Sequence, residues 1–147
     1  MLLFVTLASA APAYELLRQR DPVTCADLGE ATVGLRDELL GLARPDTLPA
    51  LVSVRAAACL AERFGADPVA HGQFATWMSG ADSGGFALMV LSRVEHLPPP
   101  VVAALLARGA LSPNRRVRAR ALQLSLKAAE AASVPAPSSS SPAAPTP

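Results

Sequence analysis

A helical phrase that recurs at a fixed distance constrains the fold of this chain more than any other feature. The segment VRAAACL at residues 54–60 returns as VRARALQ at residues 117–123, 63 residues later (54 to 117). Halfway between them, GFALMVL at residues 85–91 carries small and apolar residues in the same register. The positions in register are Ala56, Cys59 and Leu60 in the first copy and Ala87, Val90 and Leu91 in the second. A period of about 30 residues in helix-forming text predicts stacked helical hairpins.

The composition favours helix over sheet. Ala and Leu dominate the 147 residues, there is no isoleucine, and aromatic residues make up only 4%. Ala and Leu lose little side-chain freedom in a helix, whereas strands are enriched in β-branched and aromatic residues. We therefore expect an all-α protein, long enough to bury one hydrophobic core.

The two ends of the chain differ from its middle. Residues 1–13 carry no charged side chain, and an apolar run is followed by A-x-A-like sequences at 8–10 and 11–13. This is typical of a cleaved export signal, although the positively charged start is missing, and a buried N-terminal helix is the alternative. Residues 134–147 (VPAPSSSSPAAPTP) predict a disordered tail. The helical domain is then expected over residues 14–133.

Prolines, glycines and capping residues divide this domain into helices. Starts are expected at Asp21-Pro22, Asp46 or Thr47, Asp67-Pro68, Asp82 or Ser83, and Ser112-Pro113. Gly65 and Gly109 are expected to end helices. The expected helices cover residues 14–20, 22–30, 35–43, 47–64, 67–79, 83–96, 99–108 and 113–133, and the last six pair into three hairpins.

The last expected helix is apolar on two faces. Its main stripe, with 4-3-4-3 spacing, consists of Val117, Ala121, Leu124, Ala128 and Ala131. Leu122 and Leu126 lie roughly opposite this stripe. We interpret them as a hint of an interaction surface, the alternative being partial burial under their own hairpin.

The recurring phrase resembles HEAT-type repeats, in the short class also found in phycobilisome-lyase-like HEAT proteins. The resemblance covers roughly residues 35–133 and is strongest in the first and last copies of the phrase. In the middle copy Phe86 stands where the motif has Arg, which would break a ladder of polar contacts that Arg55 and Arg118 join. The resemblance implies a short right-handed α-α superhelix with a scaffolding or binding role, and lyase activity only weakly.

The two cysteines are a candidate disulfide. Cys25 and Cys59 lie on different expected helices, and in an exported chain we expect them to be oxidised to each other. The bridge would tie the N-terminal segment to the first repeat. Two buried free thiols are the alternative.

No residue pattern indicates catalysis, a metal site or a cofactor. His71 and His96 have no nearby cysteine pair and no H-x-x-x-H spacing. The Gly/Ser-rich segment 79–85 lacks both the Lys of a P-loop and the strand that precedes a nucleophile elbow. We therefore expect a protein that is not an enzyme.

The candidate partner-binding residues are one aromatic and three basic side chains. Trp77 forms an aromatic stripe with Phe74, which we interpret as core packing against the next helix, or as a binding anchor if it is exposed. Arg116 and Arg120 share one side of the last helix, and Arg55 lies in the first copy of the phrase.

From these features we expect a non-catalytic protein-binding or scaffolding protein, periplasmic or secreted, with no membrane span. The formal net charge of +1 argues against nucleic acid as the partner. The first alternative is a cytoplasmic HEAT-like module that binds nucleic acid through the Arg-rich helix. The second is a lyase-type enzyme subunit.

Overall fold

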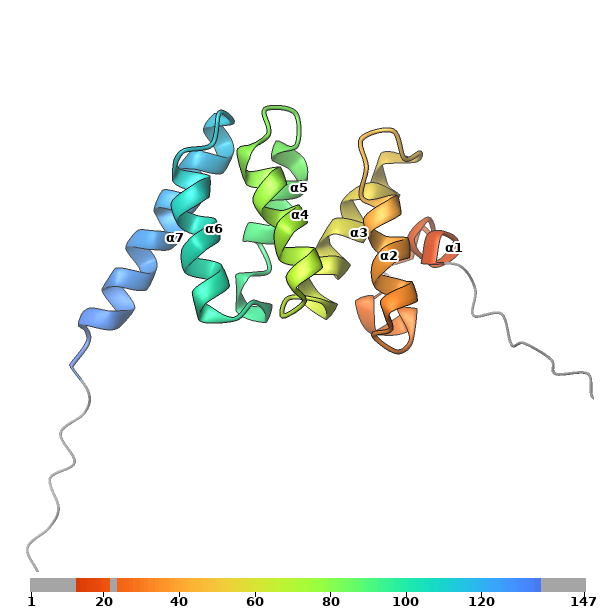
Figure 1. The fold of residues 1–147 in the computed structure, drawn as a ribbon, viewed down its shortest axis with the longest axis horizontal. Coiled ribbons are helices and arrows are strands. Elements are labelled where there is room, and N and C mark those ends of the chain that lie inside the picture. The colour runs from red at the N-terminus through yellow and green to blue at the C-terminus, as the bar shows by residue number, and fades with distance from the viewer. Residues whose placement is uncertain (1–12, 22–23, 136–147) are drawn as a thin grey trace, which may run out of the picture.

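The described part of the chain is all-helical, as the composition predicts. The computed structural model describes residues 13–21 and 24–135, so the expected export signal up to residue 12 and the expected tail from residue 136 lie outside the described residues. Within the described residues there is no strand (Figure 1). The α-helices are α1 (Ala13–Leu17), α2 (Val33–Leu42), α3 (Ala50–Arg63), α4 (Pro68–Ser79), α5 (Gly84–Leu91), α6 (Pro99–Ala110) and α7 (Arg115–Ser133), and the 3-10 helices are η1 (Cys25–Leu28) and η2 (Val94–His96).

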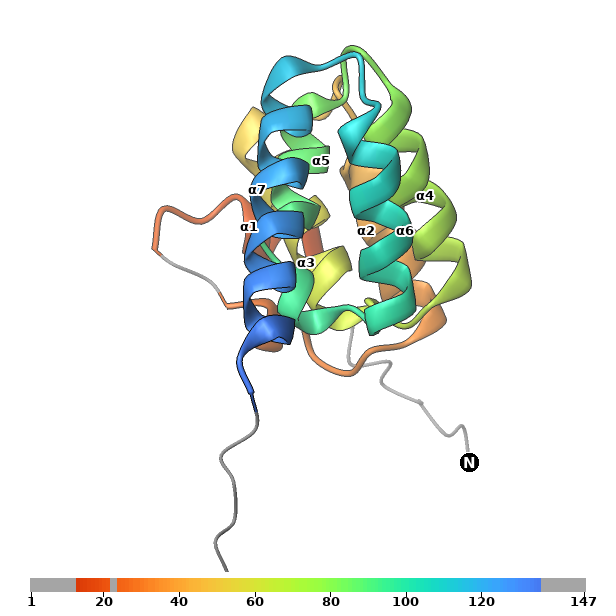
Figure 2. The same ribbon diagram turned by 90° about the vertical axis from the view of Figure 1, so that its left-hand side faces the viewer.

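The last six α-helices form three hairpins that lie side by side in a row (Figure 1). Helices α2, α4 and α6 form one layer and α3, α5 and α7 form the other, which Figure 2 shows from the α7 end. Neighbouring hairpins touch within each layer: α3 packs on α5, α5 on α7, and α4 on α6. Helix α1 lies against α2 and α3, at the opposite end from α7.

Asp67 starts α4 and also contacts the preceding hairpin. Its Oδ1 accepts hydrogen bonds from the backbone amides of Val69 and Ala70, at 2.8 and 3.2 Å, so the expected helix start at this residue is confirmed. Its Oδ2 accepts a hydrogen bond of 3.0 Å from Nη1 of Arg36, on α2. Desolvation raises the pKa of Asp67, but the hydrogen bonds from Arg36, Ala70 and Val69 outweigh it and hold this pKa below its usual value.

Polar contacts between the first two hairpins recur at one sequence separation. Arg36 and Asp67 are 31 residues apart. Arg93, which follows α5, places its Nε 3.7 Å from Oε2 of Glu62 on α3, again at a separation of 31 residues (62 to 93). Contacts in both layers at one separation indicate that the two hairpins are stacked in the same register.

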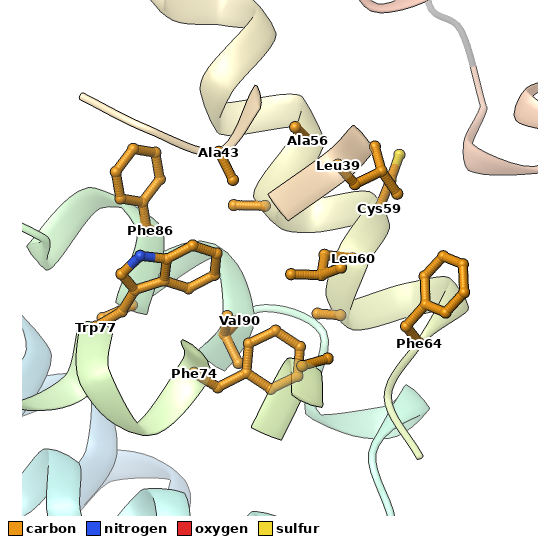
Figure 3. Packing of buried hydrophobic residues seen from close by; sticks show 14 of the residues in the cluster. Leu39, Ala43, Ala56, Cys59, Leu60, Phe64, Phe74, Trp77, Phe86 and Val90 are labelled. Carbon is orange, nitrogen blue, oxygen red and sulfur yellow. The ribbon is translucent and has the colours of Figure 1, made fainter. Parts of the chain in front are cut away.

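The main aromatic core joins α4 to α5 and faces the first hairpin (Figure 3). The ring of Trp77 lies between those of Phe74 and Phe86, with centroid distances of 6.0 and 5.2 Å. Leu60 of α3 and Val90 of α5 complete the cluster and are fully buried. Because Trp77 is only 4% exposed, it packs in the core and is not a surface anchor.

The segment expected as a helix over residues 22–30 forms only a short 3-10 helix in its described part, η1. Asp27 folds back onto the start of this turn, where its Oδ2 accepts from the amide and the hydroxyl of Thr24, both at 2.8 Å. Gly29 then adopts a φ of 84°, which an α-helix does not use. The expected α-helix is therefore wrong at this position.

Helix α3 begins later than expected. Its N-cap is Pro49, and neither Asp46 nor Thr47 caps it. Proline disfavours helical backbone at the residue before it, here Leu48, so the helix cannot extend back across this position.

The expected helix over residues 83–96 is split into α5 and η2. The hydroxyl of Ser92 donates to the carbonyl of Met89 at 2.7 Å. The amide of Arg93 donates to Val90, three residues back, and the α-helical pattern ends. Helix α5 is therefore too short to support the whole length of α7.

Helices α6 and α7 approach closely at Gly109. The sequence predicts that Gly109 ends this helix, but α6 continues to Ala110. A Cβ at Gly109 would lie 2.9 Å from the Cβ of Ala121, so the glycine allows the two helices to meet. The N-cap of α7 is Asn114, whose Oδ1 accepts from two amides of the first turn at 3.0 and 3.3 Å, whereas Ser112 is buried in the preceding loop.

Candidate protein-binding site

The N-terminal segment is fixed covalently and by arginine. Cys25 and Cys59 form the expected disulfide, with a Cα–Cα distance of 5.2 Å, which joins η1 to α3. Beside it, Nη1 and Nη2 of Arg63 donate to the backbone carbonyls of Cys25 and Gly29, both at 2.6 Å. These contacts satisfy carbonyl groups that no regular helix would pair.

Arg55 has the same kind of role about two turns earlier on α3. Its Nη1 donates to the carbonyls of Leu17 and Gln19, at 2.9 and 2.6 Å, and so holds the chain just after α1. The guanidinium expected to bind a partner is therefore engaged within the molecule. Arg55 is not part of the candidate site.

The expected ladder of arginine contacts between repeats is not formed by Arg55 and Arg118. Nη1 of Arg118 donates to the carbonyls of Ser112 and Pro113, at 2.6 and 3.0 Å, in the loop before its own helix. Phe86, at the equivalent position in the middle hairpin, is buried. Arginine contacts between the first two hairpins come from Arg36 and Arg93 instead. Between the second and third hairpins, Nη1 of Arg108 donates to Oγ of Ser79 at 3.4 Å.

Helix α7 is packed along its first half only. Val117 and Ala121 are fully buried, but no residue after Ala121 in the described part of α7 is. On the opposite face, Leu122 is 52% exposed and Leu126 is 68% exposed. The second apolar face therefore lies largely on the surface, and its own hairpin covers these two side chains only in part.

An apolar groove runs beside α7, between η2, α6 and α7. It consists of two adjoining hollows of about 680 and 400 Å³. Val102 and Leu106 of α6 form its floor, and Leu124 and Ala128 of α7 form one wall. The groove exists because η2 takes the place of further turns of α5 beneath this part of α7.

Sequence reasoning missed the groove residues Val102 and Leu106. A signal was available in the doubled pairs Val101-Val102 and Leu105-Leu106, which place apolar residues on two adjacent faces of α6. Leu105 and Leu106 are both buried, but Leu106, together with the half-buried Val102, borders the groove beside α7.

The basic residues expected to bind a partner lie on one flank of α7. Arg116 is exposed, and Arg120 is half-buried and donates from Nη1 to Oε1 of Gln123 at 2.8 Å. Lys127 follows on the same flank and borders the groove. Glu130 is the one acidic residue of α7.

Other kinds of site find little support in the described residues. No three His, Cys, Asp or Glu side chains among them gather closely enough to hold a metal ion. His71 is accounted for by its Nε2, which lies 2.7 Å from the carbonyl oxygen of Gly65. None of the helices in the described ranges is both long and apolar enough to cross a membrane.

Comparison with known proteins found no family model, no curated protein and no solved structure that matches the chain. The groove and the exposed face of α7 are therefore the features from which a function is inferred.

Proposed function

We propose that this protein is a non-catalytic, HEAT-like scaffold that binds a protein partner through its third hairpin. The observation that carries the proposal is the apolar groove between α6 and α7. Exposed apolar surfaces of this kind mark protein–protein contact sites. The exposed side chains of Leu122 and Leu126 form a second apolar surface, on the opposite face of α7.

The chemistry of the groove suits a peptide chain better than a small polar ligand. Its walls are aliphatic, and Glu95 and Lys127 at its edge supply charges of opposite sign that would orient a partner. A partner helix laid into such a groove buries one apolar face and leaves its polar face in solvent.

The HEAT-like description draws support from the arrangement of the hairpins. They stack in two layers, and the polar contacts between the first two recur at a separation of 31 residues. Repeats of equal length would stack in this way.

The disulfide supports a location outside the reducing cytoplasm, since structural disulfides persist in oxidising compartments. Ala13 starts α1 and is buried in the core, so we propose export with cleavage after the A-x-A-like sequence at 8–10, which keeps Ala13 in the mature chain. The intact mass of the mature protein, alkylated before and after reduction, tests this. Loss of the first ten residues and two alkylations only after reduction is the expected result, and a full-length chain with two free thiols would contradict export.

Site-specific photo-crosslinking tests the binding function. A benzoylphenylalanine at Ala103, an exposed residue that lines the groove, is expected to give one discrete protein adduct in cells, and the same probe at Thr76 on α4 is the matched control. Ala128→Glu places a charge in the groove and is expected to reduce the adduct about tenfold.

The opposite result is also defined. Absence of an adduct, together with a salt-dependent affinity for RNA or DNA that falls in the Arg116→Ala/Arg120→Ala variant, would replace protein binding with nucleic-acid binding.

A further inference from the structure

The outer face of α7 carries an apolar stripe in which the order and spacing of the residues are the same from either end. It consists of Ala119, Leu122, Leu126 and Ala129, with spacings of 3, 4 and 3 residues, and all four are exposed. We propose that this stripe pairs in antiparallel orientation with the same stripe of a second copy of the chain. The two-fold axis that relates the copies crosses the stripe at the level of residue 124 along the helix. The inference goes beyond the proposed function, because the stripe lies on the face of α7 opposite the groove.

The palindromic order of the stripe is what an antiparallel pair requires. With the axis near Leu124, Leu122 of one copy lies opposite the partner's Leu126, and Ala119 lies opposite the partner's Ala129. The large side chains then meet in the centre, and the small ones at both ends let the helices stay close. Every residue of the stripe obtains a complementary neighbour, and the contact closes on itself as a two-fold dimer.

The charges on α7 complement each other in the same register. At about 100° per residue, Arg116 and Glu130 lie on the same flank of the stripe, roughly 60–100° from its centre. In an antiparallel pair, equal flanks face each other, and Glu130 comes within about 3 Å along the axis of the partner's Arg116. Neither residue forms an ion pair among the described residues, so the dimer supplies two equivalent pairs.

A parallel pair lacks this complementarity. It would bring the first turns of two α7 helices together, each of which contains Arg115, Arg116 and Arg118. It would also align the two helix dipoles, whereas the antiparallel pair opposes them. The antiparallel arrangement instead places each basic helix start beside the acidic residue of the other copy.

A single introduced cysteine tests the register. Gln123 lies on the flank between Arg116 and Glu130 and close to the proposed axis, so two copies of Gln123→Cys should face each other. Both native cysteines are in the disulfide, which leaves the new thiol as the free one. Under mild oxidation most of the full chain is expected to become a covalent dimer, while Thr76→Cys, exposed on α4, stays monomeric.

A charge exchange tests the ion pairs separately from folding. Glu130→Arg is expected to weaken dimerisation about tenfold in sedimentation equilibrium, because it opposes two positive charges at each end. Adding Arg116→Glu to this variant should restore the wild-type dissociation constant. Circular dichroism of each variant checks that the helices are retained.

The outcomes separate this inference from the proposed function. A monomer at about 100 μM, well above the dissociation constant of a small specific interface, overturns the self-association. If the Ala103 probe then still captures a different protein, the binding function stands. A dimer without the Gln123→Cys cross-link, or one without rescue by the double exchange, overturns the proposed pairing.

Discussion

The two ends of the molecule reach stability by opposite means. In its described part the N-terminal segment contains only the short helices α1 and η1. A disulfide, Arg55 and Arg63 hold it to the first hairpin, as does Tyr14, whose hydroxyl donates to the carbonyl of Leu48 at 3.0 Å. The C-terminal helix α7 is 19 residues long and regular, but the second half of its described length has no such ties.

The difference follows from where the backbone hydrogen bonds go. In an irregular segment the carbonyls have no helical partner, so side chains such as Arg55 and Arg63 must supply donors. A regular helix satisfies its own backbone, and its side chains remain available for other contacts. Polar side chains therefore fix the N-terminal end, while the C-terminal end keeps an apolar surface free.

The largest expected effect tests the covalent tie. The Cys25→Ala/Cys59→Ala variant should lose about 3–4 kcal/mol in the free energy of unfolding, because a bridge across 34 residues restricts the unfolded chain. Urea denaturation measures this loss. Hydrogen exchange should show lower protection at residues 13–30 and unchanged protection in α7, and a loss spread evenly over the chain would contradict the comparison.

The next effect tests the one place where α7 is tightly held. Gly109→Ala should destabilise the protein by about 1–3 kcal/mol, because the added methyl group overlaps Ala121 and forces α7 away from α6. The matched control is Gly72→Ala in α4, where a Cβ meets nothing within 4 Å and the change should stabilise the helix by about 0.5–1 kcal/mol. Equal effects of the two changes in thermal unfolding would show that α6 and α7 do not meet as described.

A smaller effect is expected from the polar ties. Arg63→Met keeps the aliphatic stem but removes two hydrogen bonds to backbone carbonyls, and should cost about 1–2 kcal/mol. Arg44→Met removes an exposed arginine whose Nε lies 3.8 Å from Asp46, and should change stability by less than about 0.5 kcal/mol. If both variants unfold at the same urea concentration, the carbonyl contacts of Arg63 do not stabilise the N-terminal end.

Asp67 links the first two hairpins in a pH-dependent way. Its pKa is lower in the folded than in the unfolded protein, so its contribution is present above the unfolded pKa and is lost as the pH falls through the folded value. Asp67→Asn keeps an N-cap side chain but removes the charge. The unfolding free energy of the variant should therefore fall less than that of the wild type between pH 5 and pH 2. This range is set by the usual Asp pKa of about 4. Parallel acid-unfolding curves would contradict the ion pair with Arg36.

The smallest effect should come from the exposed face of α7. Leu126→Ser should change the unfolding free energy of the monomer by less than about 0.5 kcal/mol, since the residue is 68% exposed. The measurement uses dilute protein, so that association does not contribute. A loss similar to that of Gly109→Ala would mean that this end is as firmly packed as the other.

Much of the fold could be predicted from the sequence, because local residues determine it. Asp67-Pro68 correctly predicts the start of α4, although the same pair at Asp21-Pro22 is followed only by η1 in the described residues, and the spacing of apolar residues on α7 predicts both of its faces. The end of α5 could not be predicted in this way, because Ser92 is also compatible with a longer helix. The helix ends where the Ser92 hydroxyl donates a hydrogen bond to the carbonyl of Met89.

The candidate site could be predicted only in part. The cysteine pair and the exposed Leu122 and Leu126 followed from composition and periodicity. The interpretation of Trp77 as core packing against the next helix is confirmed by its contact with Phe86. Arg55 was ambiguous, because an arginine serves equally well inside a contact or on a surface, and its partner Leu17 lies 38 residues away in the sequence.

Asp67 also has a consequence for how the array assembles. One carboxylate both begins α4 and reaches back to Arg36, so the conformation that starts the second hairpin is favoured when the first is already in place. Helix initiation and docking of neighbours are then a single cooperative step at this junction. The first hairpin acts as a template for the second, and order is expected to spread from the disulfide-bonded end toward α7.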